Sequence, residues 1–150
     1  MDLIPYHIGI ATNDIETSRR DITAALGLTW SKPASQRTLM YDVQGHPQIQ
    51  PLSCSSQQGP IHIDLIEGEP GTLWKVAGPQ IHHVAYRTDD LPGDIAALEK
   101  LGWRMEITVP NGAGHPSVFA YLVRDDGARV ELVEDDTYRT YMGSFDQPRS

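Results

Sequence analysis

The chain carries one pattern twice, and this internal repeat limits the folds it can form. The first copy begins at residues 6–10 (YHIGI) and the second at residues 82–86 (HHVAY). Each copy continues into a stretch with helical spacing of apolar residues that ends at a glycine, Gly27 or Gly102. The separation of His7 from His83 nearly equals that of the two glycines, so the copies keep one register.

Each copy also closes on an alternating segment that contains an acid. These segments are residues 61–67 (IHIDLIE) and 129–134 (RVELVE). Alternation of apolar and other residues is typical of a half-buried strand. Further strands are predicted at residues 37–44, 49–55, 103–109 and 118–123. The order strand, helix, strand, strand, strand therefore occurs twice, which predicts an α+β fold of two tandem βαβββ modules.

Local signals predict the boundaries of these elements. Asn13, with Glu16 three residues later, predicts the N-cap of the first helix, and Asp89 or Asp90 predicts that of the second. We expect a single domain over 1–150, with module one at 5–67, a Gly- and Pro-rich linker at 68–80, module two at 81–135 and a C-terminal tail at 136–150.

Composition argues against several classes of function. A net charge of −8 disfavours nucleic acid and anionic membranes as partners. No apolar run approaches the length of a membrane span, and the N-terminus has no signal-type region. The single cysteine, Cys54, fits a reducing compartment and is expected to be buried and inert. We therefore expect a cytoplasmic protein whose partner is a small molecule.

Strand parity predicts which side chains share a surface, because side chains alternate between the two faces of a strand. With the isoleucines of the first strand against its helix, His7 lies on the opposite face, and the same rule places His83 there. Gly9 and Ala85 follow on that face and are small enough to leave room for a ligand. His82 has the other parity, which predicts a structural role.

The closing strands add acids to this surface. Parity places Asp64 and Glu131 opposite the core, with His62 on the same face as Asp64. Two histidines and two carboxylates that converge from equivalent points of a repeat favour a divalent-metal site with nitrogen and oxygen ligands.

The repeated motifs resemble those of the vicinal oxygen chelate superfamily, which includes glyoxalase I, methylmalonyl-CoA epimerase, extradiol dioxygenases and bleomycin-binding proteins. The resemblance rests on residues 7–10 (HIGI), 63–67 (IDLIE), 83–86 (HVAY) and 130–133 (VELV). Their spacing is most similar to the epimerase-like, glyoxalase-4-type branch. The resemblance covers nearly the whole chain and implies a curled mixed sheet with the helices on its outer face.

The resemblance also implies the ligands. In this family the first strand of each module supplies a histidine, and the last strand supplies Glu or sometimes Gln or His. The matching positions are His7, Asp64, His83 and Glu131. Asp64 departs from the pattern because Asp is one methylene shorter than Glu, and His62 is the alternative. We also expect a homodimer, with the modules paired within one chain or exchanged between two.

A divalent metal with open positions can chelate a substrate through two neighbouring oxygens and stabilise an enolate. We therefore expect an epimerase, isomerase or lyase that acts on a small carbonyl or thioester substrate and uses Zn, Co, Ni or Mn. The candidate general bases are Asp42 and Glu106, at corresponding places in the two modules, and Asp64 if it is not a ligand.

Two other functions also fit the sequence. His7, His83 and Glu131 alone form a two-His, one-carboxylate triad, which suits Fe(II) in a dioxygenase. Alternatively, a metal-free drug- or natural-product-binding protein would hold its ligand between Trp30, Trp74 and Trp103. Further candidates for the pocket are Arg37, Arg87 and Arg104 as carboxylate partners, together with His46, His115 and Tyr121.

Overall fold

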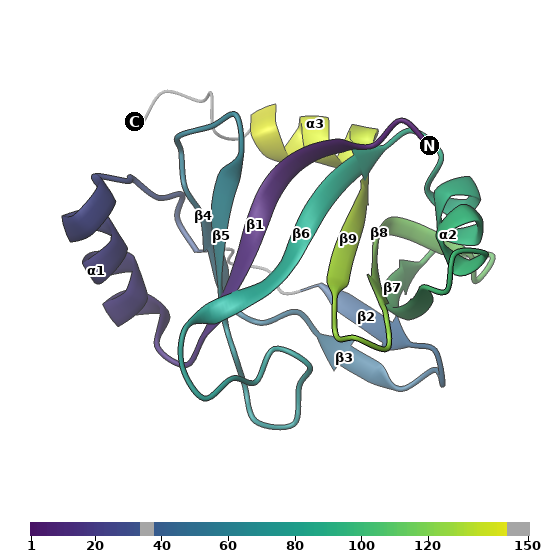
Figure 1. Ribbon diagram of the computed structural model, residues 1–150, viewed down its shortest axis with the longest axis horizontal. Coiled ribbons are helices and arrows are strands. Elements are labelled where there is room, and N and C mark those ends of the chain that lie inside the picture. The colour runs from purple at the N-terminus through teal and green to yellow at the C-terminus, as the bar shows by residue number, and fades with distance from the viewer. Residues whose placement is uncertain (34–37, 144–150) are drawn as a thin grey trace.

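The computed structural model describes residues 1–33 and 38–143, and it shows one curled sheet to which both modules contribute (Figure 1). Arg37, predicted to begin a strand and to hold a carboxylate, lies outside the described residues. The elements are β1 (Ile4–Thr12), α1 (Ile15–Leu26), β2 (Leu39–Asp42), β3 (Pro47–Ile49), β4 (Ser53–Ser55), β5 (His62–Glu67), β6 (Gln80–Thr88), α2 (Leu91–Glu99), β7 (Arg104–Pro110), β8 (Pro116–Val123), β9 (Arg129–Glu134) and α3 (Asp135–Gly143).

The pairing of strands brings the two copies of the repeat together at the centre of the sheet. Its order is β3-β2-β7-β8-β9-β6-β1-β5-β4. The first strand of each module runs parallel to the last, β1 with β5 and β6 with β9, and β1 and β6 are antiparallel. The register sets Asp64 opposite Gly9 and Glu131 opposite Ala85, so the two acids occupy equivalent positions.

The sheet curls back on itself because the modules share strands. β2, from module one, pairs with β7 of module two, and β3 follows it as the sheet's edge strand. The other edge strand is β4, and residues 50–52 alone connect it to β3 along the chain. The two edge strands are therefore joined by a short segment of the chain. The sheet encloses an interior, and both modules line it.

Two local predictions are wrong in detail. Asp14, not Asn13, caps α1, because its carboxylate accepts the backbone N–H of Thr17 at 2.9 Å. The strand predicted at 49–55 is divided into β3 and β4 around Pro51, which has no N–H to donate to a ladder. The predicted tail begins as the helix α3, which packs on β6 and β9. Asp90 caps α2, as one of the two alternatives expected.

The apolar side chains form three separate clusters. One lies inside the curl of the sheet, one under α2 and one under α1. Trp74, Trp103 and Trp30 belong to these three clusters respectively. The three tryptophans therefore do not share one cluster. Over the described residues, no helix is long and apolar enough to cross a membrane.

Candidate metal centre

Three of the four predicted ligands meet inside the sheet. His7 lies on β1, His83 on β6 and Glu131 on β9. The two Nε2 atoms are 2.8 Å apart, and Oε2 of Glu131 lies 3.0 Å from each of them. All three side chains are buried, with exposures of 5%, 0% and 9%. The central pairing of β1 with β6 thus brings equivalent residues of the repeat to one point.

The chemistry of these atoms fits a divalent cation. Each of the three can offer a lone pair, and Oε2 of Glu131 has no hydrogen-bond partner among the described residues. Metal–ligand bonds of about 2.0–2.2 Å set neighbouring ligand atoms roughly 3 Å apart, which is the spacing found here. Two imidazoles and a carboxylate suit Zn²⁺ and other first-row divalent metals.

Asp64 lies on the outer side of His7 and not at this meeting point. Its Oδ2 is 3.6 Å from Nδ1 of His7, the ring nitrogen that faces away from His83. Within the described part of the chain, Oδ1 of Asp64 and Nδ1 of His7 have no hydrogen-bond partner, although both are buried. A carboxylate beside the far nitrogen of a ligand histidine orients the ring and raises its basicity.

His62, the alternative to Asp64, is held by its own loop. Its Nδ1 lies 2.7 Å from the carbonyl oxygen of Ser56, and its ring rests against Gly59. In the described structure His62 is not part of the cluster formed by His7, His83 and Glu131.

Gly9 has a different role from the one predicted. A Cβ at this position would overlap the imidazole ring of His83, which lies against the backbone of β1. The space that glycine leaves is therefore filled by a candidate ligand side chain and not by a bound molecule. Ala85, the equivalent residue of module two, pairs with His7 across the two strands, and there is room for its buried methyl group.

Burial and charge shift the titration of the cluster. Burial alone would raise the pKa of Glu131, but the close approach of the His7 and His83 imidazoles to Oε2 outweighs it and lowers that pKa to about 2. Burial lowers the pKa of His83. Burial also acts to lower the pKa of His7, but the charge of Asp64 and the contact with Glu131 outweigh it, so that pKa is raised. The carboxylate is ionised across the neutral pH range.

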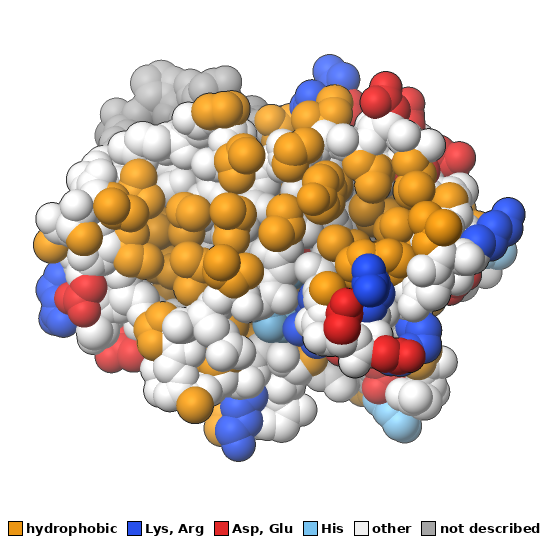
Figure 2. All heavy atoms as spheres, in the orientation of Figure 1, with side chains coloured by type: hydrophobic (Ala, Val, Ile, Leu, Met, Phe, Trp, Pro, Cys, Tyr) orange, Lys and Arg blue, Asp and Glu red, His pale blue; other side chains and the backbone are white. Residues whose placement is uncertain are grey.

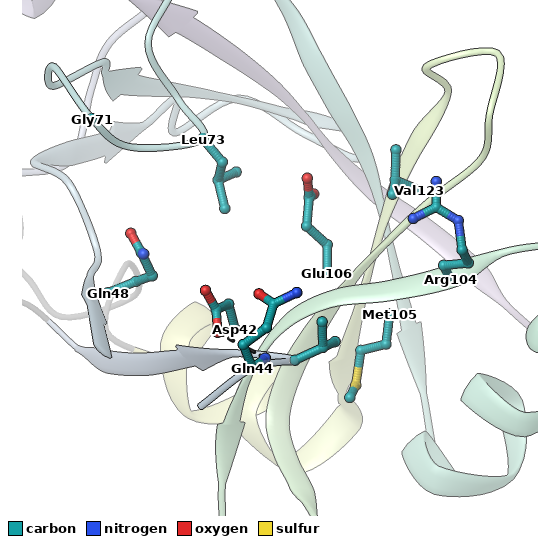
Figure 3. A pocket seen from close by; sticks show the side chains of 10 residues that line it. Asp42, Gln44, Gln48, Gly71, Leu73, Arg104, Met105, Glu106 and Val123 are labelled. Atoms are coloured by element: carbon teal, nitrogen blue, oxygen red, sulfur yellow. Dashed lines mark hydrogen bonds between the residues drawn. The ribbon is translucent and has the colours of Figure 1, made fainter. Parts of the chain in front are cut away.

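The predicted bases Asp42 and Glu106 lie together outside this cluster, and both are partly exposed. They line a cavity of about 300 Å³, and their side chains point into the same space (Figure 3). Asp42 accepts the backbone N–H of His46 at 2.8 Å, which, with the other contacts from His46 and Gln44, lowers its pKa. Glu106 forms a two-pronged ion pair with Arg129, at 2.7 and 3.0 Å.

Two residues that the sequence analysis did not assign to the site connect Glu106 to the cluster. Nη1 of Arg129 lies 3.2 Å from Nε2 of His82, and Nδ1 of His82 lies 3.0 Å from Nδ1 of His83. Burial, with the neighbouring His83 and Arg129, lowers the pKa of His82 to about 3, so the ring is neutral. The doubled histidine at 82–83 was the one available signal for this role.

The other candidates are placed elsewhere. Arg87 lies 3.6 Å from Asp135 and stacks over Tyr138. Arg104 borders the cavity of Asp42 and Glu106, and it pairs with Asp125 at 2.9 Å. His46 and His115 are exposed. Tyr121 is buried in the inner cluster with its ring centroid 4.8 Å from that of His83. Cys54 is buried, and burial raises its pKa to about 11, as expected of an inert thiol.

A curled sheet built from two βαβββ modules, with a His–His–carboxylate cluster at their junction, defines a structural class. The sequence profile of the Glyoxalase/Bleomycin resistance protein/Dioxygenase superfamily matches residues 6–121. The chain belongs to this superfamily, and the predicted resemblance and fold class are confirmed. No curated protein is a significant match to the sequence.

Solved structures share the fold at low sequence identity. A methylmalonyl-CoA epimerase in complex with methylmalonyl-CoA and NH4+ has a TM-score of 0.62 and 19% identity, over 88% of this chain and 94% of that one. The epimerase from Mycobacterium tuberculosis has a TM-score of 0.57 and 20% identity, over 87% and 86%. A mutant of 4-hydroxymandelate synthase from Streptomyces coelicolor has a TM-score of 0.60 and 15% identity, over 88% of this chain but 38% of that one.

Proposed function

We propose that the protein is a metal-dependent epimerase, isomerase or lyase that acts on a small carbonyl or thioester substrate through an enolate. The observation that carries this proposal is the buried convergence of His7, His83 and Glu131, with Nε2, Nε2 and Oε2 within 3.0 Å of one another. The epimerases among the structural neighbours add support at the level of the fold.

His7, His83 and Glu131 would hold the metal. When bound, a divalent ion supplies Lewis-acid stabilisation of the negative charge that develops on the substrate oxygens. The chain's own contribution is to fix the ligand atoms on adjacent strands and to surround them with apolar side chains. Tyr6 and Tyr121 pack on the two histidine rings, at centroid distances of 4.5 and 4.8 Å, and exclude water from that side.

We assign the proton transfer to Glu106 ahead of Asp42. A general base must lie within reach of the proton that it removes, so position decides between the two. Asp42 is stabilised as the anion by its contacts with His46, which lower its pKa. Glu106 borders the same cavity and leads through Arg129 to His82, beside the cluster.

The test of this function is proton exchange at carbon. Protein reconstituted with Zn²⁺, Co²⁺, Ni²⁺ or Mn²⁺ is incubated in deuterated water with methylmalonyl and related 2-substituted malonyl thioesters, and deuterium incorporation is followed by NMR. We expect incorporation with the wild type, a large loss in Glu106→Gln and a smaller loss in Asp42→Asn. Lack of exchange by wild-type protein of verified metal content, over this panel, contradicts the proposal.

A dioxygenase is the second candidate, and the position of Asp64 favours it. With Asp64 outside the cluster, the inner set is two histidines and one carboxylate, the triad that suits Fe(II) and dioxygen. Oxygen uptake by iron-loaded protein, in the presence of small carbonyl compounds, would support this candidate over proton exchange.

The apolar outer face supports a homodimer. Figure 2 shows apolar side chains in a band across β1 and β6, between α1 and α2. Ile81 is 67% exposed there, and Ile8 and Val84, which pair across the two strands, are half-buried. A contiguous apolar surface of this kind marks an interaction site. Light scattering should give the mass of a dimer, and Ile81→Lys should shift it toward the monomer.

A further inference from the structure

His83 has a histidine partner on its far side, whereas the far nitrogen of the equivalent His7 lies near Asp64. The adjacent residue His82 turns its Nδ1 toward Nδ1 of His83, at 3.0 Å. Both rings are buried, with residue exposures of 8% and 2%. The rings meet almost edge to face, with an interplanar angle of 89°, so that each nitrogen approaches the other.

The positions of the protons follow from what each nitrogen can do. A neutral His83 that offers Nε2 to a metal carries its proton on Nδ1, because an imidazole has one N–H. That N–H needs an acceptor, and Nδ1 of His82 supplies one only when it is unprotonated. The proton of His82 is then on Nε2, which donates a hydrogen bond to the carbonyl oxygen of Leu73 at 3.1 Å.

One competing arrangement exists. If His82 carried its proton on Nδ1, it would donate to His83, and its Nε2 would accept from Arg129 at 3.2 Å. His83 would then hold its own proton on Nε2 and could not bind a metal through that atom. The direction of the hydrogen bond between the two Nδ1 atoms therefore decides whether Nε2 of His83 can bind a metal.

The packing around His82 fixes its ring in this place. Trp74 stacks on it at 6.1 Å with an interplanar angle of 26°, and Tyr121 meets it edge-on at 5.8 Å. The ring therefore keeps Nδ1 directed at His83 and Nε2 at Leu73.

We propose that His82 is a positioning residue of the metal centre, which accepts the Nδ1–H of His83 and so keeps Nε2 of His83 free for the metal. This inference rests on the proposed metal site. It makes the doubled histidine one unit, with an inner residue that binds and a neighbour that sets its tautomer. Loss of such an outer partner costs roughly 10–100-fold in metal affinity.

The first test uses wild-type protein loaded with Zn²⁺ and labelled with ¹⁵N. We expect NMR to show a proton on Nδ1 of His83, a scalar coupling through the hydrogen bond between the two Nδ1 atoms, and a proton on Nε2 of His82. A proton on Nδ1 of His82, or no coupling between the rings, would overturn the inference. This measurement does not depend on whether a variant folds.

The second test compares Zn²⁺ affinity between variants by competition with a chromophoric chelator. His82→Phe keeps a ring but removes the acceptor, so a loss of roughly 10–100-fold is expected. His82→Asn restores an acceptor oxygen near the position of Nδ1 and should recover most of that loss. The control His62→Phe removes another buried histidine outside the cluster and should leave the affinity unchanged.

The outcomes separate the two proposals. Wild-type protein that takes up no metal contradicts the proposed function. Wild-type protein that binds Zn²⁺, while His82→Phe binds it equally tightly, overturns only the role of His82.

Discussion

The two modules place equivalent residues around the proposed metal centre in different ways. Both first-strand histidines turn Nε2 inward, yet only module two adds its acid to the cluster. Glu131, opposite Ala85, has its Oε2 3.0 Å from both histidines. Asp64, opposite Gly9, stops 3.6 Å from the outer nitrogen of His7. One methylene of side-chain length separates an inner ligand from an outer partner.

This difference shows how a duplicated unit acquires an asymmetric site. Module one uses its acid as the outer partner of His7, so no other residue is needed there. In module two the acid, Glu131, lies within the cluster. His82, the residue before His83, takes the outer position beside that histidine. Module one has Tyr6 in that preceding position, and its ring meets that of His7 edge to face.

The largest effect is expected when the inner acid is changed. Glu131→Gln removes the only carboxylate of the described cluster and leaves two neutral imidazoles. We expect metal affinity to fall by more than the roughly 100-fold upper range for an outer partner. Isothermal titration with Zn²⁺ measures it, and a loss no greater than that of Asp64→Asn would show that the two acids are equivalent.

The glycine of module one is the next most sensitive position. Gly9→Ala puts a methyl group where the His83 ring lies, so the ring must move or the strands must separate. We expect a destabilisation of about 1–3 kcal/mol, as for other overpacked sites, together with weaker metal binding. Chemical denaturation measures the first and chelator competition the second.

The matched control for that change is Gly112→Ala. A Cβ at Gly112 meets no atom of the described chain within 4 Å, and a positive φ is not required there. An equal loss in both variants would mean that contact with His83 is not the reason for glycine at position 9.

The outer acid should have an intermediate effect. Asp64→Asn keeps the shape of the side chain but removes the charge beside Nδ1 of His7. We expect roughly 10–100-fold weaker Zn²⁺ binding, with one metal still bound per chain. Loss of all metal in this variant would instead identify Asp64 as an inner ligand.

The dependence of metal binding on pH is a second test of the role of Asp64. Asp64 acts to raise the pKa of His7, and a proton on His7 competes with the metal. Affinity should therefore rise with pH until His7 has lost that proton. In Asp64→Asn the rise should occur at lower pH, because the pKa of His7 falls. Zn²⁺ titrations at several pH values measure the midpoint, and an unshifted midpoint contradicts the role given to Asp64.

The smallest expected effect is a gain. Asp64→Glu adds the methylene that Glu131 already has, which should bring a second carboxylate to the centre. X-ray absorption of the Zn²⁺-loaded protein should then show one more oxygen ligand, with a few-fold higher affinity. Glu131→Asp is the reciprocal control and should lose a ligand.

The convergence of His7, His83 and Glu131 could be predicted because it depends on the internal repeat and on strand parity, and both can be read directly from the sequence. The offset of His7 from His83 and the alternation around Glu131 are sufficient to place these three side chains on one surface. The departure at Asp64 was also visible, because a shorter side chain on an equivalent backbone position reaches less far.

Long-range pairing could not be predicted in this way. The attachment of β2 to β7 joins Tyr41 to Thr108 across the two modules, and no local pattern specifies that register. The chain of contacts from Glu106 through Arg129 to His82 joins β7, β9 and β6, and no local pattern specifies which of their side chains meet. Parity gave His82 a structural role, whereas its ring turns back toward the neighbouring His83.

The first measurement to make is the element-resolved metal content of protein purified anaerobically without chelator, compared with His83→Ala. We expect about one Zn, Co, Ni or Mn per wild-type chain and none in the variant, with iron in that stoichiometry indicating the dioxygenase. Wild-type protein that holds no metal, even after reconstitution, would contradict the central claim that His7, His83 and Glu131 form a metal centre.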